Sequence, residues 1–212
     1  MSAAASAMSD DGFKAFREVT GLVRPPAAHG CPCVEVVPNL WTAHFHDVDT
    51  KDKLTKLAPP VTVVVNAGVD KCPTKPGSYG EGIEVVCIDG LLDDPDQLKK
   101  VDAMPEGPEK TAARAALPTF EPEMCAGDAY KDFDRVSELI TKTSAAGGAT
   151  LVHCHASLSR SVAFILAHLM KTQSLSAVEA AKLLKTKWDA TWPNDTFVKQ
   201  LLKYEEELVA AR

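Results

Sequence analysis

A cysteine and an arginine stand close together in residues 153–161, which read His-Cys-His-Ala-Ser-Leu-Ser-Arg-Ser. Five small or neutral residues separate Cys154 from Arg160. A thiolate is the nucleophilic form of cysteine, and a guanidinium can bind two oxygens of a phosphate at once. The pattern therefore predicts a cysteine nucleophile placed beneath a bound phosphate.

The residues on either side indicate how this loop is held. Residues 149–152, Ala-Thr-Leu-Val, are typical of a strand, and the apolar run 162–170 is typical of a helix. Backbone N–H groups at the start of a helix bind anions, and the same positive environment favours a thiolate. We expect a strand, a tight loop and a helix, with the amides of residues 155–160 around the phosphate.

The loop resembles the signature of the cysteine-dependent protein tyrosine phosphatases, and its end, Ser159-Arg160-Ser161, narrows the resemblance to the dual-specificity branch. Other segments that resemble this family are residues 34–40, 91–95, 146–154 and 193–205. The resemblance covers residues 34–98 and 129–208. It implies an atypical dual-specificity phosphatase, in which the cysteine attacks phosphorus and water then hydrolyses the phosphocysteine.

The resemblance assigns a role to each polar residue of the loop. It makes Cys154 the nucleophile, and Ser161 a hydrogen-bond donor to the thiolate that also aids breakdown of the phosphocysteine. A cap of the following helix is the competing role for Ser161, and both roles can coexist. His153 orients the loop from the strand. The phosphate is expected on Arg160 and on the backbone of the other loop residues, His155, Ala156, Ser157, Leu158 and Ser159.

The leaving oxygen needs a proton, so a carboxylic acid must approach the phosphate. Our choice for this general acid is Asp93, because the segment Leu91-Leu92-Asp93-Asp94-Pro95 follows a strand and resembles the acid loop of the family. Asp94 and Asp89 stay open as alternatives. Each of these carboxylates could instead be a solvated loop residue.

Ser157 departs from the family pattern, which usually has glycine at this position. Glycine adopts backbone conformations that cost other residues energy, so Ser157 could narrow the phosphate cradle or slow the reaction. A catalytically weak pseudophosphatase, acting as a phosphate-binding or scaffold module, is therefore the alternative function. A third candidate is a sulfurtransferase-like or arsenate-reducing enzyme, which the resemblance of the acid segment and the last helix disfavours.

The composition is that of an ordinary globular domain, with 45% apolar and 25% charged residues among 212. The net charge of −6 argues against nucleic-acid binding. No apolar run approaches the ~20 residues of a membrane span, and residues 1–7 lack the features of a secretion signal. We expect a cytoplasmic protein with reduced cysteines. The sequence does not indicate an oligomeric state.

Neither a metal nor another cofactor is expected. His153 and His155 lack the further ligands of a closed zinc site, and Cys31-Pro32-Cys33 alone is a weak metal motif. Arg160 is the one fixed cation of the loop, whereas relatives acting on inositol phospholipids tend to carry lysines there. We therefore expect a phosphoprotein substrate rather than a phosphoinositide. The choice between phosphotyrosine and phosphoserine or phosphothreonine stays open.

The chain divides into two expected parts. Residues 1–33 should form a tail, a short helix beginning near Ser9 and a proline-containing linker, and residues 34–212 the catalytic domain. β-Branched runs alternate there with helical periodicity, which indicates an α/β fold with a central, mostly parallel twisted sheet of about five strands and helices on both faces. An insertion at about 99–127 is expected to be either a lid over the site or a surface insertion.

Overall fold

The computed structural model of the chain describes residues 3–22, 25, 33–91, 104–116 and 127–212. Its sheet has five strands in the order β1-β2-β5-β3-β4. The strands are β1 (Val34–Val37), β2 (Leu40–Thr42), β3 (Val61–Asn66), β4 (Glu84–Cys87) and β5 (Ala149–His153). β1 and β2 are antiparallel, and all other neighbours are parallel. The predicted α/β fold with a mostly parallel sheet is confirmed.

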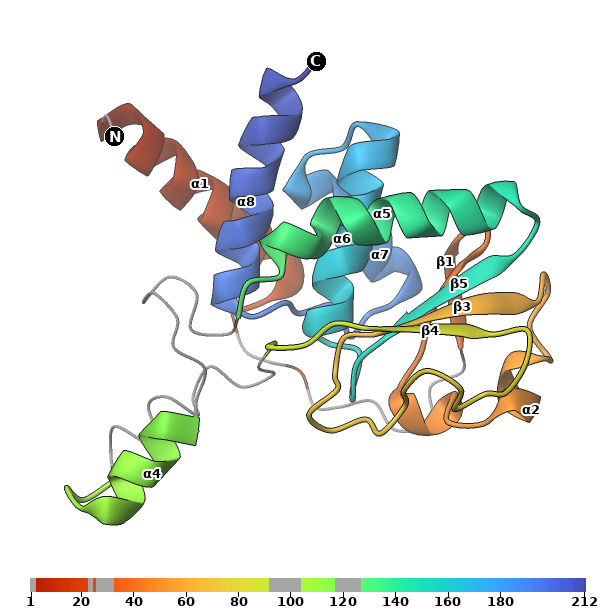
Figure 1. Ribbon diagram of the computed structural model, residues 1–212. Helices are drawn as coiled ribbons and strands as arrows, with labels where there is room; N and C mark the ends of the chain where they lie inside the picture. The colour runs from red at the N-terminus through yellow and green to blue at the C-terminus, as the bar shows by residue number, and fades with distance from the viewer. Residues whose placement is uncertain (1–2, 23–24, 26–32, 92–103, 117–126) are drawn as a thin grey trace.

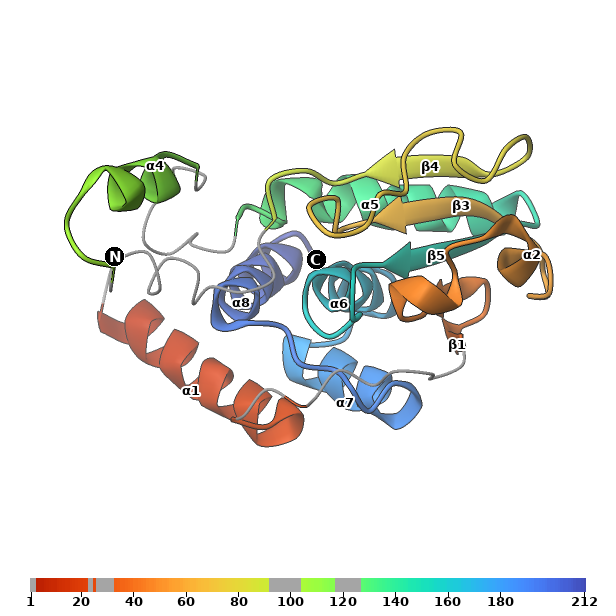
Figure 2. The ribbon, with the colours of Figure 1, turned by 90° about the horizontal axis from the view of Figure 1, so that it is seen from below.

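The long helices gather on one face of the sheet (Figures 1 and 2). They are α1 (Ala3–Thr20), α5 (Tyr130–Ala145), α6 (Arg160–Gln173), α7 (Ala177–Lys187) and α8 (Asp195–Ala210). The short helix α2 (Lys51–Leu54) packs against the opposite face, and the 3-10 helix η1 (Phe45–Asp47) lies shortly before it in the chain. Helices therefore lie on both faces, as predicted, but the two layers differ greatly in size.

The valine run of β3 shows how the sequence divides the core. Val63 and Val65 belong to the large cluster with residues of α5 and α6, whereas Val64 packs with Leu54 of α2 on the other face. Successive side chains of a strand point to opposite faces. A strand buried on both faces needs apolar residues at consecutive positions, which explains the unbroken run of β-branched residues.

The helix that follows β5 lies at the centre of the helical layer. Every residue of α6 from Arg160 to Met170 is buried. A helix buried on all sides must be apolar around its whole circumference, as its sequence Val-Ala-Phe-Ile-Leu-Ala is. The next helix, α7, begins with the predicted capping box, in which Ser176 and Glu179 hydrogen-bond to each other's backbone N–H groups.

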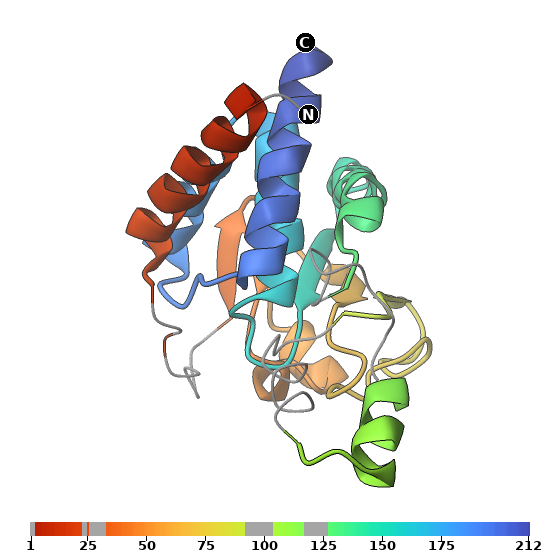
Figure 3. The ribbon, with the colours of Figure 1, turned by 90° about the vertical axis from the view of Figure 1, so that its left-hand side faces the viewer.

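Two segments differ from the prediction. α1 begins at Ala3 rather than near Ser9, because the alanine-rich residues 3–7 favour a helix. Within the predicted insertion, residues 108–116 form the helix α4 (Pro108–Ala116), which Figures 1 and 3 show standing away from the sheet. The rest of the predicted insertion largely lies outside the described residues. The lid and the domain boundary after residue 33 stay predictions.

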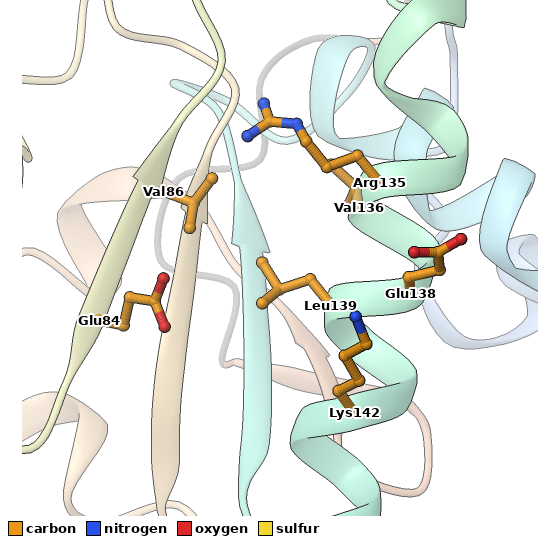
Figure 4. Close-up of a pocket in the computed structure, with 7 residues that line it drawn as sticks. All are labelled: Glu84, Val86, Arg135, Val136, Glu138, Leu139 and Lys142. Carbon is orange, nitrogen blue, oxygen red and sulfur yellow. The ribbon is translucent and has the colours of Figure 1, made fainter.

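A pocket lies between the edge strand β4 and the helix α5 (Figure 4). We call it the β4–α5 pocket. Its lining combines a few apolar side chains with charged groups of both signs: Glu84, Val86, Arg135, Val136, Glu138, Leu139 and Lys142.

Candidate active site

The loop of residues 153–161, called the Cys154 loop below, joins the middle of the sheet to the central helix. β5 lies between β2 and β3 and ends at His153, and α6 begins at Arg160. Figure 2 shows β5 running into the turn that enters α6. Ligand sites in parallel sheets lie beyond the carboxyl ends of the strands. The loop occupies such a position, and the predicted order of strand, loop and helix is confirmed.

The thiol of Cys154 lies beside the hydroxyl of Ser161. Both residues are fully buried, and the Ser161 Oγ donates a hydrogen bond to the Cys154 Sγ at 3.4 Å. The chain after β3 passes very close to this point, because a Cβ added at Gly68 would lie 3.0 Å from the Cα of Cys154. Any larger residue at position 68 would push against the backbone of the cysteine.

Arg160 places a guanidinium at the start of α6 and is fully buried. Its Nη1 forms an ion pair with the Asp70 carboxylate and donates to the Leu91 carbonyl at 3.4 Å. A buried charge is tolerated when it is paired and hydrogen-bonded. Asp70 was not predicted from the sequence. The available signal was topological, because Asp70 follows β3, the neighbour of β5, and the ends of parallel neighbours meet at one edge of the sheet.

Ser157 occupies the position where the family usually has glycine, and its backbone has the positive φ of 50° that favours glycine. Its side chain is fully buried. The Oγ donates to the Ala43 carbonyl at 2.5 Å and accepts from the Cys154 N–H at 3.4 Å. The hydroxyl therefore fastens the loop to the segment after β2 and stays hydrogen-bonded in the interior.

Three carbonyls in the middle of the loop, those of residues 155, 157 and 158, accept hydrogen bonds from outside it. They are His155 O from the Phe45 N–H at 3.0 Å, Ser157 O from the Trp188 Nε1–H at 2.7 Å, and Leu158 O from the Trp192 N–H at 2.8 Å. In a planar trans peptide the N–H points opposite to the C=O. The N–H groups of residues 156, 158 and 159 therefore point away from these outer partners.

His153 is buried and neutral. Burial lowers the pKa of His153 to about 4, the charge of Arg160 acts in the same direction, and a hydrogen bond to Cys154 opposes both. That bond joins the His153 Nδ1 and the Cys154 carbonyl oxygen at 3.2 Å. A carbonyl can only accept, so Nδ1 carries the ring proton. His153 thus fixes the orientation of the peptide that follows Cys154.

The predicted loop residues come together, but the predicted general acid is not among the described residues. Asp93 and the alternative Asp94 lie in the segment 92–103, outside the described part of the chain. Asp89 is described and is exposed after the end of β4. The residues just before the predicted acid do approach the site, since the Leu91 carbonyl accepts from Arg160.

Within the described ranges, no cluster of histidine, cysteine and carboxylate side chains could hold a metal ion. Cys31 of the Cys-Pro-Cys motif lies outside those ranges. Burial, together with the charge of Asp47, raises the pKa of Cys33 to about 11, so its thiolate is scarce at neutral pH. Of the helices that are described, none is both long enough and apolar enough to cross a membrane.

Comparison with known proteins gives a consistent result. Residues 109–207 match the model of the dual specificity phosphatase catalytic domain. The chain is 42% identical over 76 residues to dual specificity protein phosphatase 14 of Mus musculus and 39% identical over 79 residues to dual specificity protein phosphatase 21 of Homo sapiens. These matches cover 36% and 37% of this chain and 38% and 42% of the relatives, less than half of either relative.

A solved structure extends the likeness over most of the chain. The crystal structure of a variant of human DUSP28 superposes with a TM-score of 0.63 at 26% identity, covering 89% of this chain and 100% of that one. This likeness is consistent with the geometry of the Cys154 loop and with the strand order of the sheet. The chain is similar in sequence and fold to the atypical dual-specificity phosphatases of the protein tyrosine phosphatase superfamily.

Proposed function

We propose that the protein hydrolyses phosphorylated tyrosine, serine or threonine side chains of proteins through a phosphocysteine intermediate at Cys154. The observation that carries this proposal is the hydrogen bond from the Ser161 hydroxyl to the Cys154 Sγ, at the entry of a helix whose first residue is the buried Arg160. A thiol, a donor aimed at it and a guanidinium at a helix N-terminus suit attack on a phosphate.

Phosphate binding follows from the direction of the loop peptides. The N–H groups of residues 156, 158 and 159 point away from the partners that hold their carbonyls. We assign them, with the other amides of residues 155–160 and the Arg160 guanidinium, to the phosphate oxygens. Phosphoryl transfer depends mainly on such positioning and charge stabilisation.

The reaction proceeds in two displacements. The Cys154 thiolate attacks phosphorus, the S–P bond forms, the ester P–O bond breaks, and the leaving oxygen takes a proton from Asp93. Water then attacks phosphorus and gives a proton back to Asp93, and the S–P bond breaks to release phosphate and the thiolate. Ser161 stabilises the sulfur as it leaves in the second step. Asp94 and Asp89 are the alternatives for the acid.

A phosphoprotein suits the loop better than a phosphoinositide. Arg160 is the only lysine or arginine in residues 153–161. On the side of the loop near His155 the closest rings are imidazoles, since those of His44 and His46 lie 5.4 and 5.8 Å from the His155 ring. An inositol ring with several phosphates needs more fixed positive charge than this. Action without a cofactor and a cytoplasmic location belong to the same proposal.

The first test is hydrolysis of para-nitrophenyl phosphate by the full chain with a chelator present. Wild type should turn over, Cys154→Ser should lose activity, and the control Cys87→Ser, on a half-buried thiol of β4, should keep it. Asp93→Ala comes next and should slow turnover while vanadate still binds. A wild-type chain that binds vanadate without turnover would contradict the proposed activity and favour a phosphate-binding module.

A further inference from the structure

Arg17 is an almost fully buried cation in a helix at the surface of the helical layer. Its exposed fraction is 4%. It lies in the last turn of α1, which packs against α7 and α8 (Figure 3). Burying a guanidinium is costly unless its donors are satisfied. The partners of Arg17 therefore indicate what this position is built to hold.

Three of those partners lie in residues 192–195, the segment that leads into α8 and includes its first residue. The Arg17 Nη2 donates to the Pro193 carbonyl at 2.8 Å and forms an ion pair with the Asp195 carboxylate. The guanidinium carbon lies 4.8 Å from the centre of the Trp192 ring, a cation–π distance. The remaining contacts are within α1, to Phe13 and Thr20. The Trp192 ring also donates through Nε1 to the Gly21 carbonyl at 3.1 Å.

The same segment holds the Cys154 loop. The Trp192 N–H donates to the Leu158 carbonyl at 2.8 Å, and the Asn194 N–H donates to the Ser159 Oγ at 2.9 Å. Leu158 and Ser159 directly precede Arg160. Residues 192–195 are therefore fastened on one side to Arg17 and on the other to the part of the loop whose N–H groups we assign to phosphate.

We propose that Arg17 is a positioning residue for phosphate binding, which makes α1 part of the catalytic unit. Arg17 fixes residues 192–195, these hold the Leu158 carbonyl and the Ser159 hydroxyl, and the N–H group of Ser159 thereby keeps its direction toward the phosphate. The proposal rests on the proposed function only in requiring that the Cys154 loop bind phosphate. It does not require turnover.

The test is calorimetric binding of orthovanadate and of inorganic phosphate to the full chain. Arg17→Met keeps the apolar stem but removes the donors, so it should weaken binding about tenfold, because small misplacements of binding groups are costly. Arg17→Lys should recover part of the loss, since an ammonium can still donate to Pro193 and Asp195. The control is Lys14→Met, on an exposed residue of the same helix, which should bind like wild type.

Thermal unfolding of the same variants separates positioning from mere stability. A lower melting temperature of Arg17→Met with wild-type affinity for vanadate would overturn the proposal. If Arg17→Met does not fold, vanadate binding by Asp195→Asn is the deciding measurement. The side chain of Asp195 is 67% exposed, so this substitution should be tolerated. Asp195→Asn should also bind vanadate more weakly than wild type does. Wild-type affinity for vanadate in both Asp195→Asn and Arg17→Lys would overturn the proposal. Wild type that binds vanadate without turnover contradicts only the proposed activity.

Discussion

Two arginines show how differently charge is used in the Cys154 loop and in the β4–α5 pocket. Arg160 has no exposed side-chain surface and pairs with Asp70, which is ninety residues away in the chain. The side chain of Arg135 is 56% exposed and pairs with Asp132, three residues earlier in its own helix. One ion pair joins a buried guanidinium to a carboxylate of a separate segment, whereas the other lies along one helix at the surface.

The difference predicts which positions tolerate change. Removing one partner of a buried pair leaves an uncompensated charge and is strongly destabilising, whereas an exposed pair contributes little. The loop is also held through its carbonyls by residues 45, 188 and 192. Figure 4 shows charged side chains arranged around the few apolar ones in the pocket. A charge change should therefore act strongly in the loop and weakly in the pocket.

Replacement of the two arginines by lysine should give the largest contrast. Arg160→Lys removes the planar fork that we propose binds two phosphate oxygens, so kcat/KM for an aryl phosphate should fall roughly 10²- to 10³-fold. Arg135→Lys is the matched control and should leave kcat/KM unchanged. Steady-state kinetics with para-nitrophenyl phosphate measures both. Arg160→Lys that retains activity within a few-fold would show that the guanidinium is not the main phosphate ligand.

Acid should lower the free energy of unfolding, because two buried histidines have lowered pKa values. Burial lowers the pKa values of His153 and His168 to about 4, from an ordinary value of 6.5. The unfolded chain therefore binds more protons between these values, and the free energy of unfolding should fall as pH drops from 6.5 to 4, by up to about 3 kcal/mol for each histidine. Urea unfolding across this range measures the slope.

A variant of one histidine tests the cause of this slope. The His168 Nδ1 lies 2.9 Å from the Ser137 Oγ in the packed interface of α5 and α6. His168→Gln should lower stability at pH 7 but also reduce the slope below pH 6.5. The control His46→Gln changes an exposed histidine and should keep the wild-type slope. An unchanged slope in His168→Gln would assign the acid effect to other groups.

Two serines with positive φ separate backbone strain from hydrogen bonding. Ser157 and Ser174 have φ values of 50° and 55°, but only Ser157 is buried, and Ser174 is exposed at the end of α6. Ser174→Gly should stabilise by roughly 1 kcal/mol, because glycine accepts this conformation. Ser157→Ala keeps the strain and leaves the Ala43 carbonyl without its donor, so it should cost about 1–3 kcal/mol.

Ser157→Gly completes this comparison. It relieves the strain but loses the same hydrogen bonds, so it should be less destabilising than Ser157→Ala by roughly 1 kcal/mol. Chemical denaturation gives the free energies, and kcat/KM shows whether the tether to Ala43 serves the reaction. If Ser157→Gly is more active than wild type, the serine slows catalysis, as the sequence first suggested.

The part of the site that is local in sequence could be predicted, and the part that is not local could not. Residues 149–170 carry strand, loop and helix signals in direct succession, so the positions of Cys154 and Arg160 followed from the sequence. The partners Asp70, Ala43 and Trp188 are isolated residues in other segments. Nothing in their spacing marks them, because the sheet order brings Asp70 and Ala43 to the loop and the packing of α7 brings Trp188 there.

The fold shows the same limit at its helices. The capping box at Ser176 marks the start of α7 in the sequence, and the structure begins the helix there. α1 lacks such a signal at Ala3, and its start depends on the propensity of a run of alanines. The role proposed for Arg17 could not be predicted from the sequence, because the apolar spacing of α1 is typical of any helix that packs on a domain. Its partners are identified only when residues 192–195 are placed beside it.

Charge removal in the β4–α5 pocket should have the smallest effect. Glu138 is 58% exposed and lies 3.8 Å from Lys171, an exposed pair of low expected value. Glu138→Gln and Lys142→Met should each change the free energy of unfolding by less than about 0.5 kcal/mol and leave kcat/KM unchanged. α5 nevertheless packs directly on α6, the helix that begins with Arg160. A clear loss of kcat/KM with unchanged stability would mean that the pocket is coupled to the loop through α6, and the contrast between the two regions would fail.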